Sequence, residues 1–229
     1  MLGLPRAHHC LTDSTNRHAR ELAADGAPHG TLVTAAEQSA GRGRQGREWT
    51  APAGSAVLMS LVLREFDELL PLAASVAVSE ACEAAGVNCS IKWPNDVWID
   101  GRKVAGILVE GRPQEGWAVL GIGLNVGTEA EQLPSELRET ATSLRIATGL
   151  APSTEGVLET ILAALERRLG DDRGQILAAW GERDALRGRA VRWQEGQGVA
   201  VGVDRSGALL VDTDGGRVAL EAGEVHLSR

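Results

Sequence analysis

The chain has few aromatic residues and few cysteines. Its 229 residues include six Trp, one Phe and no Tyr, so aliphatic side chains must supply the core. The three cysteines, Cys10, Cys82 and Cys89, are odd in number and lack CxxC spacing. We therefore expect buried, reduced thiols rather than a disulfide framework, a redox pair or a metal site.

Long apolar runs are also absent. No N-terminal stretch has the length of a signal peptide or a membrane span, because Pro5, Arg6 and two histidines interrupt the first ten residues. His8 and His9 have no other ligand-type side chains at metal spacing, so exposed polar residues are expected there. These absences predict a cytoplasmic protein without membrane association and without a metal site.

Positive charge is lacking in the chain as a whole but is concentrated in one segment. The net charge is −8, whereas residues 41–49, GRGRQGREW, hold three Arg against one Glu. Glycine lets backbone N–H groups turn toward an anion, and arginine is a forked donor suited to phosphate or carboxylate. A local cationic loop on an acidic protein favours a small anionic ligand over a nucleic-acid backbone.

This arginine loop, residues 41–49, has no apolar face that a core could hold. Ordering the loop would cost on the order of 10 kcal/mol. We therefore expect it to be mobile in the empty protein and to close on a charged ligand, with a matching decrease in protease cleavage.

Secondary structure in the first half follows from local signals. Residues 13–26 begin with helix-capping residue types and end at a glycine, which predicts a short helix. Residues 31–36 and 56–63 are compact apolar runs, which predicts buried strands on either side of the arginine loop. Residues 71–86 are rich in alanine, with Pro first and Gly last, which predicts a helix.

A strong turn signal divides the next segment. Asp100 and Gly101 lie between two apolar runs, and such a pair favours a tight hairpin because both positions accept positive φ. Residues 91–125 are therefore predicted to form an antiparallel meander. Its register places Lys103 just after the turn and Asn125 at the far end of the last strand.

The C-terminal part changes character at residue 188. Residues 134–143 predict a loop or weak helix, and helical patterns follow near residues 155–169 and 172–186. From residue 188 onward, short β runs alternate with turn signals, so we expect a small β module over residues 188–229 after a main domain over residues 1–187. With about 42 residues, the module is near the size below which domains rarely fold alone, so it should dock on the main domain.

Four polar signatures lie at predicted strand or helix ends. They are STN at residues 14–16, Gln38 with the arginine loop, KWPND at residues 92–96 and GRKVAGILVE at residues 101–110. Alone, each has a plain alternative: a helix cap, a solvated turn, an Asx turn or a solvated lysine after a hairpin. In this order, and with GIGLNV at residues 121–126, they resemble the catalytic domain of biotin protein ligases.

The resemblance implies a fold and an activity. The fold is α+β, with a mixed, largely antiparallel sheet and flanking helices, similar to class II synthetases, and a small C-terminal SH3-like β-barrel. The activity is the ATP-dependent conversion of biotin to biotinoyl-5′-AMP, followed by transfer of biotin to one lysine of a biotin carboxyl carrier domain of a carboxylase. Only thirteen residues precede Ser14, so we expect a ligase without the DNA-binding repressor domain of some members. Both a monomer and a homodimer are compatible with the sequence.

The resemblance also implies site residues. The residues expected at biotin are Ser14, Thr15, Asn16, Gln38, Arg42, Gly43, Arg44 and Lys103. The residues expected at the nucleotide are Arg47, Trp49, Lys92, Asn95, Asp96 and Asn125. Lys103, Arg42 and Lys92 are the expected catalytic charges. They would offset the repulsion between the biotin carboxylate and a phosphate, about 4 kcal/mol at 4 Å and an effective dielectric of 20.

The chain shows no metal cage of its own, so Mg²⁺ is expected to arrive with ATP. Residues 128–142 occupy the place of a second family loop that orders over the adenylate, but their sequence does not identify individual site residues.

Two other functions compete with this interpretation. A lipoate or octanoate ligase or transferase shares the broader fold, but KWPND and GRGRQGREW favour biotin. A nucleic-acid-binding module would use the arginine loop on phosphates. The acidic net charge and the absence of interleaved aromatic residues argue against that module.

Overall fold

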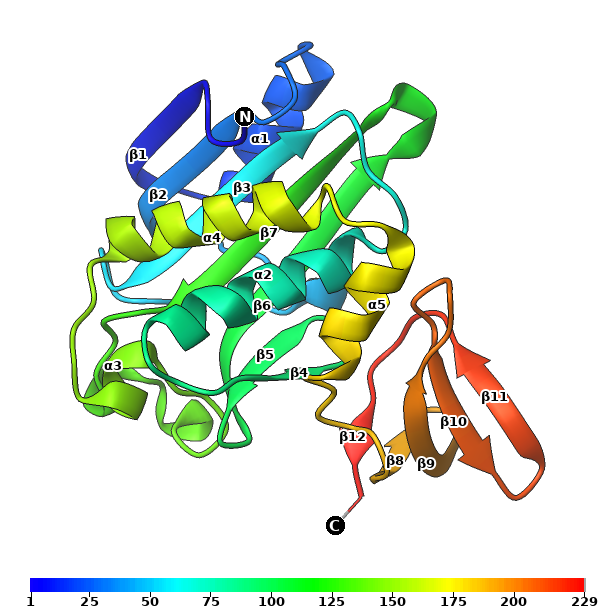
Figure 1. The fold of residues 1–229 in the computed structure, drawn as a ribbon. Helices are drawn as coiled ribbons and strands as arrows, with labels where there is room; N and C mark the ends of the chain where they lie inside the picture. Colours follow the sequence, from blue (N-terminus) through cyan, green and yellow to red (C-terminus); the bar gives the residue numbers. More distant parts are fainter. Residues whose placement is uncertain (229) are drawn as a thin grey trace.

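The computed structural model describes residues 1–228 and contains two β-sheets (Figure 1). The large sheet has seven strands in the order β1-β2-β3-β7-β6-β5-β4, and the small sheet has five in the order β11-β10-β9-β8-β12. Only β1 and β2 pair in parallel among the described strands of the large sheet. The predicted fold class, a mixed and largely antiparallel sheet with helices and a small β module, is confirmed.

The large sheet contains β1 (Arg6–Thr12), β2 (Leu32–Gln38), β3 (Ala56–Leu63), β4 (Ser90–Lys92), β5 (Asp96–Ile99), β6 (Arg102–Arg112) and β7 (Trp117–Asn125). The small sheet contains β8 (Ala190–Trp193), β9 (Gly196–Val203), β10 (Leu209–Thr213), β11 (Gly216–Leu220) and β12 (His226–Leu227). The helices are α1 (Thr15–Ala24), α2 (Leu70–Ala84), α3 (Leu144–Thr148), α4 (Thr154–Arg168) and α5 (Arg173–Gly181).

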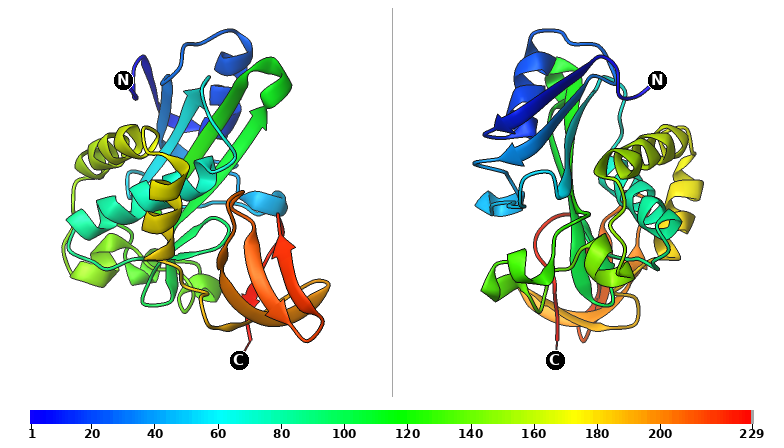
Figure 2. Two further views of the ribbon diagram at one scale, coloured as in Figure 1. Left: turned by 45° about the vertical axis from the view of Figure 1, so that its right-hand side comes forward. Right: turned by 90° about the vertical axis from the view of Figure 1, so that its left-hand side faces the viewer.

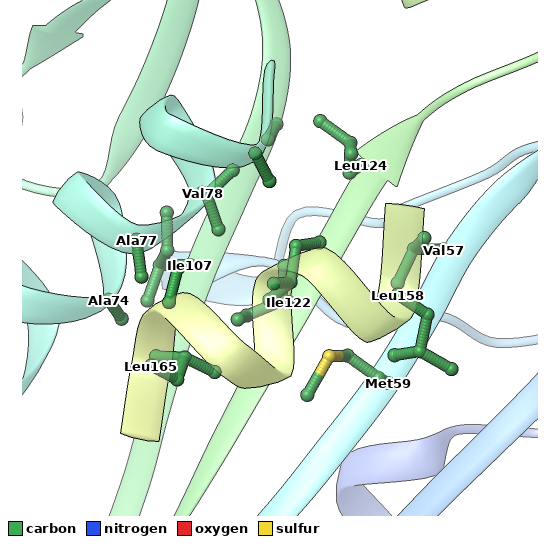
Figure 3. Packing of buried hydrophobic residues seen from close by; sticks show 14 of the residues in the cluster. Val57, Met59, Ala74, Ala77, Val78, Ile107, Ile122, Leu124, Leu158 and Leu165 are labelled. Atoms are coloured by element: carbon green, nitrogen blue, oxygen red, sulfur yellow. The ribbon is translucent and has the colours of Figure 1, made fainter. Parts of the chain in front are cut away.

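Helices cover the large sheet from both sides. Figure 2 shows the sheet nearly edge-on, with α2 and α4 on one face and α1 on the other. Alternation along β7 serves both faces, because Ile122 and Leu124 join the core under α2 and α4 (Figure 3) while Val119 packs with α1. Gly121 and Gly123 lie on the α1 face, where the lack of a side chain leaves room for Asn16 of α1 and for the Trp49 ring.

The predicted meander is confirmed, as are the two strands that flank the arginine loop. Asp100 and Gly101 have φ values of 49° and 76° and form the tight turn between β5 and β6. β6 then pairs antiparallel with β7 from Ala105 to Arg112. The loop connects β2 to β3 and includes a short 3-10 turn, Arg44–Gly46, on the α1 side of the sheet (Figure 2).

Strand β1 was not predicted, and the last helix is shorter than expected. β1 is a polar edge strand whose residues RAHHCLT show no apolar alternation, so only its pairing with β2 reveals it. Helix α5 ends at Gly181 instead of residue 186 because the chain then runs beside β4. There the Ile91 N–H donates to the Arg183 carbonyl at 2.7 Å, and the Ala185 N–H donates to the Ile91 carbonyl at 3.0 Å.

The small sheet docks on the large domain, as expected from its size. Leu72 and Trp93 of the main domain share one buried cluster with Leu209 and Val211 of the small sheet. The Trp93 indole N–H also donates to the Gly207 carbonyl at 3.0 Å. Within residues 1–228, no helix combines the length and apolarity that crossing a membrane requires.

Candidate active site

One cavity of about 460 Å³ collects every predicted site residue. β6 and β7 form its floor, the arginine loop forms one wall, and residues between 133 and 141 contribute to another. The cavity therefore brings together segments that are more than one hundred residues apart in the sequence.

The floor depends on three glycines. A Cβ atom at Gly121 would lie 2.0 Å from Asn16 Oδ1, and one at Gly123 would lie 2.5 Å from the Trp49 ring. Gly106 of β6 pairs with Gly123 and also lies beneath the Trp49 ring. Alternation of Gly with Ile and Leu in GIGLN was the sequence signal for this floor, although the glycines were not predicted as site residues.

The first residues of α1 form the polar end of the cavity. Ser14 stands at the N-cap position but its side chain does not cap the helix. Gln38 Oε1 accepts from the Thr15 N–H at 2.7 Å and lies 3.1 Å from the Thr15 hydroxyl. Asn16 is buried and donates through Nδ2 to Glu110 at 2.9 Å. These side chains are thus turned inward as a hydrogen-bonding surface.

Two residues behind this polar end were not predicted. The Ser60 hydroxyl, fully buried on β3, lies 2.8 Å from Thr15 Oγ1 and 2.6 Å from Asn16 Oδ1. Glu110 of β6 contacts Asn16, Arg20 and Arg42. A lone serine in the apolar run AVLMSLVL and a glutamate at the end of KVAGILVE were the available signals.

The opposite end of the cavity is cationic. Lys103 Nζ lies 2.6 Å from Asp96 Oδ1 and 5.7 Å from the centroid of the Trp49 ring. Lys92 Nζ lies 5.4 Å from the Trp98 ring centroid, and burial lowers the pKa of Lys92 although Asp96 acts in the other direction. The chain contains only these two lysines, and both line the cavity.

Contacts outside the arginine loop hold each of its arginines. Arg42 Nη1 lies 3.3 Å from Glu110 Oε1, and Arg47 Nη1 lies 2.8 Å from Glu224 Oε1 in the small domain. Arg44 makes long hydrogen bonds to Asn95 Oδ1 at 3.4 Å and to the Gly223 carbonyl at 3.5 Å, and burial lowers its pKa. These contacts lie outside the loop and offset part of the cost of ordering it. The mobility of the loop in the empty protein and its closure on a ligand stay predictions.

Asn125 connects the floor to the wall formed by residues 133–141. Its Nδ2 donates to the Thr142 carbonyl at 3.0 Å. Beside it, the Lys103 N–H donates to the Thr140 carbonyl at 2.7 Å and the Thr142 N–H donates to the Lys103 carbonyl at 2.8 Å. The backbone that carries Lys103 is therefore fixed by the same segment that encloses the cavity.

The donor set of the cavity does not form a metal cage. Among residues 1–228 there is no cluster of three or more His, Cys, Asp or Glu side chains arranged to hold a metal ion. The carboxylates that line the cavity are Glu48 and Asp96, and Asp96 is paired with Lys103. Such a site suits a hard cation that enters with phosphate groups and keeps several waters.

The arrangement has a definite chemical polarity. Neutral hydrogen-bonding groups gather at Thr15 and Asn16, the half-buried Trp49 ring lies over the glycine floor, and cations gather at Lys92 and Lys103. It suits a ligand with a neutral hydrogen-bonding head and an anionic end. Positioned cations of this kind stabilise charge that develops during phosphoryl or acyl transfer.

Comparison with known families agrees with this geometry. The model of the biotin/lipoate A/B protein ligase family matches residues 9–127. The model of the biotin protein ligase C-terminal domain matches residues 188–228.

Individual relatives cover nearly the whole chain. The bifunctional ligase/repressor BirA of Bacillus subtilis is 37% identical over 99% of this chain and 75% of its own length. The biotin–[acetyl-CoA-carboxylase] ligase of Mycobacterium tuberculosis is 36% identical over 94% of this chain and 86% of its own. The structure of a biotin protein ligase from Aquifex aeolicus in complex with biotin and ATP is 29% identical. It superposes with a TM-score of 0.86 and covers 98% of both chains.

Proposed function

The chain belongs to the biotin/lipoate A/B protein ligase family and is a biotin protein ligase, and on that premise we propose which residues perform its two steps. The activity is that of a biotin–[acetyl-CoA-carboxylase] ligase. In the first step, a carboxylate oxygen of biotin attacks the α-phosphate of ATP and diphosphate leaves. In the second step, a lysine amine of a carrier domain attacks the acyl carbon of biotinoyl-5′-AMP and AMP leaves.

The polarity of the cavity is the observation that carries this proposal. Biotin has a neutral ureido head and an anionic tail, which match the end formed by Thr15 and Asn16 and the end formed by Lys103. Ser14 and Gln38 complete the ureido site. Gly43 and Arg44 close over the bound biotin from the arginine loop.

Electrostatics explains how the first step is accelerated. Two unit negative charges at about 4 Å repel by roughly 4 kcal/mol at an effective dielectric of 20, and the reaction requires that approach. Lys103 is placed between the carboxylate and the α-phosphate, and Arg42 and Lys92 add positive charge on either side. No protein nucleophile is needed, because positioning and charge compensation supply the catalysis.

The nucleotide occupies the side of the cavity bounded by Trp49 and Asn125. Trp49 offers adenine a flat apolar face. Its buried Nε1 has no hydrogen-bond acceptor among the described residues, and a bound ligand could supply one. Arg47, Lys92 and Asn95 face the phosphates. Mg²⁺ would neutralise phosphate charge there, with Asp96 as the nearby protein oxygen.

The second step requires a dry cavity and a docked partner. Biotinoyl-AMP is a mixed anhydride that water hydrolyses, so the arginine loop and residues 128–142 must exclude solvent until the acceptor amine arrives. The acceptor is a lysine of a biotin carboxyl carrier domain. We place the catalytic unit in residues 1–187 and assign residues 188–229 to a domain that supports the arginine loop through Gly223 and Glu224.

A single assay tests the activity and its closest rival. The protein is incubated with ATP, Mg²⁺, a biotin carboxyl carrier domain and either biotin or lipoate, and the carrier mass is measured. We expect a mass increase with biotin and none with lipoate, and no increase when the carrier lysine is replaced by arginine. Modification by lipoate alone would overturn the assignment of the head-group pocket.

A further inference from the structure

Glu110 lies directly behind the polar end of the cavity. Its carboxylate accepts from Asn16 Nδ2 at 2.9 Å and lies 3.3 Å from both Arg20 Nη1 and Arg42 Nη1. The side chain is 21% exposed, and it does not line the cavity itself. Any influence on a ligand must therefore pass through the residues that Glu110 contacts.

The contacts of Glu110 fix the orientation of the Asn16 amide. Glu110 takes hydrogen bonds from Asn16 Nδ2 and from two arginines, so the Asn16 NH₂ group faces the carboxylate. Asn16 Oδ1 then faces the Ser60 hydroxyl at 2.6 Å. Because an amide oxygen has no proton to give, Ser60 must donate its single proton to Asn16.

The same constraint continues to Thr15. Ser60 Oγ is also 2.8 Å from Thr15 Oγ1 and could donate to it, but its single proton is already given to Asn16 Oδ1. The Thr15 hydroxyl itself donates to Gln38 Oε1 at 3.1 Å. The Thr15 proton therefore stays within the protein, and because Ser60 does not donate to Thr15, the lone pairs of Thr15 Oγ1 are left for the cavity.

A glycine in the sheet leaves space for this chain of hydrogen bonds. Ser60 of β3 pairs with Gly121 of β7, and Asn16 lies over Gly121. A side chain at that position would displace the amide from both partners. The four groups are buried or half-buried. Hydrogen bonds are stronger in such surroundings and an unpaired polar group is costly, so one arrangement of donors and acceptors is favoured.

We propose that Glu110 is a positioning residue that sets the proton direction of the chain Asn16–Ser60–Thr15 and thereby selects head groups that donate N–H to Thr15. This inference rests on the proposed function, since the ureido group of biotin offers N–H donors and lipoate offers none. A site built to accept an N–H rejects a ligand that lacks it, because its buried polar groups are then left unpaired.

The test measures the affinity of the full-length enzyme for biotin by calorimetry. Glu110→Gln keeps the size of the side chain but can present either an acceptor or a donor to Asn16, so the direction of the chain is no longer fixed. We expect the Kd for biotin to rise about tenfold, which corresponds to one hydrogen bond. The Kd for ATP should be unchanged. Glu21→Gln, an equivalent change on the exposed side of α1, should bind biotin as the parent does.

A double-mutant cycle separates positioning from simple packing. Ser60→Ala breaks the chain while leaving Glu110 and its arginine contacts intact. We expect Glu110→Gln together with Ser60→Ala to weaken binding no more than either change alone, because both act through the same chain. Independent effects, about a hundredfold together, would overturn the proposal, as would parental affinity in either single variant.

Head-group selectivity gives a second readout. The parent should prefer biotin to its ureido N-methyl derivative, and Glu110→Gln should reduce that preference. An unchanged preference would overturn the inference. Failure of the parent itself to bind biotin would instead contradict the proposed function, so the two failures can be told apart.

Discussion

The ammonium group of Lys103 lies 2.6 Å from the carboxylate of Asp96, on the adjacent strand of the sheet. Asp96 therefore holds the main cation of the cavity in place before any substrate is present. We expect Lys103 to turn toward two anionic substrates when they enter, which would leave Asp96 as an oxygen ligand for the cation that accompanies ATP.

Replacing Lys103 tests its role in forming the adenylate. Lys103→Gln should slow biotin-dependent exchange between ATP and diphosphate by about 10²- to 10³-fold, because a positioned charge is lost from the transition state. Arg102→Gln, at the neighbouring position outside the cavity, should leave the exchange rate near that of the parent. A Lys103→Gln enzyme with parental exchange would show that another cation performs the step.

Filling the glycine floor tests the position of Trp49. The added Cβ in Gly123→Ala would overlap the Trp49 ring, so the ring must move, and we expect the KM for ATP to rise. Gly127→Ala is the matched control, because the nearest atoms that its Cβ would meet, in Ser55, are 3.9 Å away. Equal KM values for these two variants would place adenine away from Trp49.

The contact between Arg47 and Glu224 tests the support that the small domain gives to the arginine loop. Glu224→Gln removes an exposed ion pair, so the free energy of unfolding should change by less than about 1 kcal/mol. Release of free biotinoyl-AMP should rise about two- to fivefold as the loop loses an anchor. Glu221→Gln, which removes the same charge nearby without an ion pair to Arg47, should release no more adenylate than the parent.

The ion pair between Glu80 of α2 and Arg168 of α4 can be used to test how these two helices are held together at low pH. Burial alone would raise the pKa of Glu80, but hydrogen bonds from Arg168 and Arg167 outweigh burial and lower it. A lowered carboxyl pKa stabilises the fold above the ordinary value of 4.5, and this stabilisation is lost as the pH falls through the lowered pKa.

Glu80→Gln should therefore reduce the free energy of unfolding by about 2 kcal/mol at pH 7. Denaturant titrations at pH 7 and near pH 3 should show the difference from the parent shrinking in acid. Glu159→Gln on the exposed side of α4 should have little effect at either pH. A difference that stays constant with pH would mean that Glu80 acts through packing rather than charge.

Local signals predicted most of the large sheet. Asp100 and Gly101 identified the hairpin because positive φ at both positions restricts the residue types that fit. Apolar runs identified β2 and β3 because these strands are largely buried. Strand β1 and the end of α5 escaped prediction because pairing with distant segments defines them, and the residues themselves carry no apolar pattern.

The functional site likewise contains residues that local sequence motifs predict and residues that only contacts between distant segments reveal. Residues such as Lys103 and Asn125 were predicted from motifs, and they line one cavity. Ser60 and Glu110 were missed because their importance arises from contacts with Asn16, which is 44 and 94 positions away in the sequence. Likewise, Gly121 and Gly123 matter for the volume they leave empty, which becomes visible only when Asn16 and Trp49 lie above them.

The confinement of both lysines to the cavity makes the protein suitable for chemical footprinting. Acylating reagents react with neutral side-chain amines, and the chain has such amines only at Lys92 and Lys103. The lowered pKa of Lys92 favours its neutral form, whereas the carboxylate of Asp96 engages Lys103. Mass spectrometry of the acylated enzyme would thus report directly on whether substrates fill the cavity, without a background of labelled surface lysines.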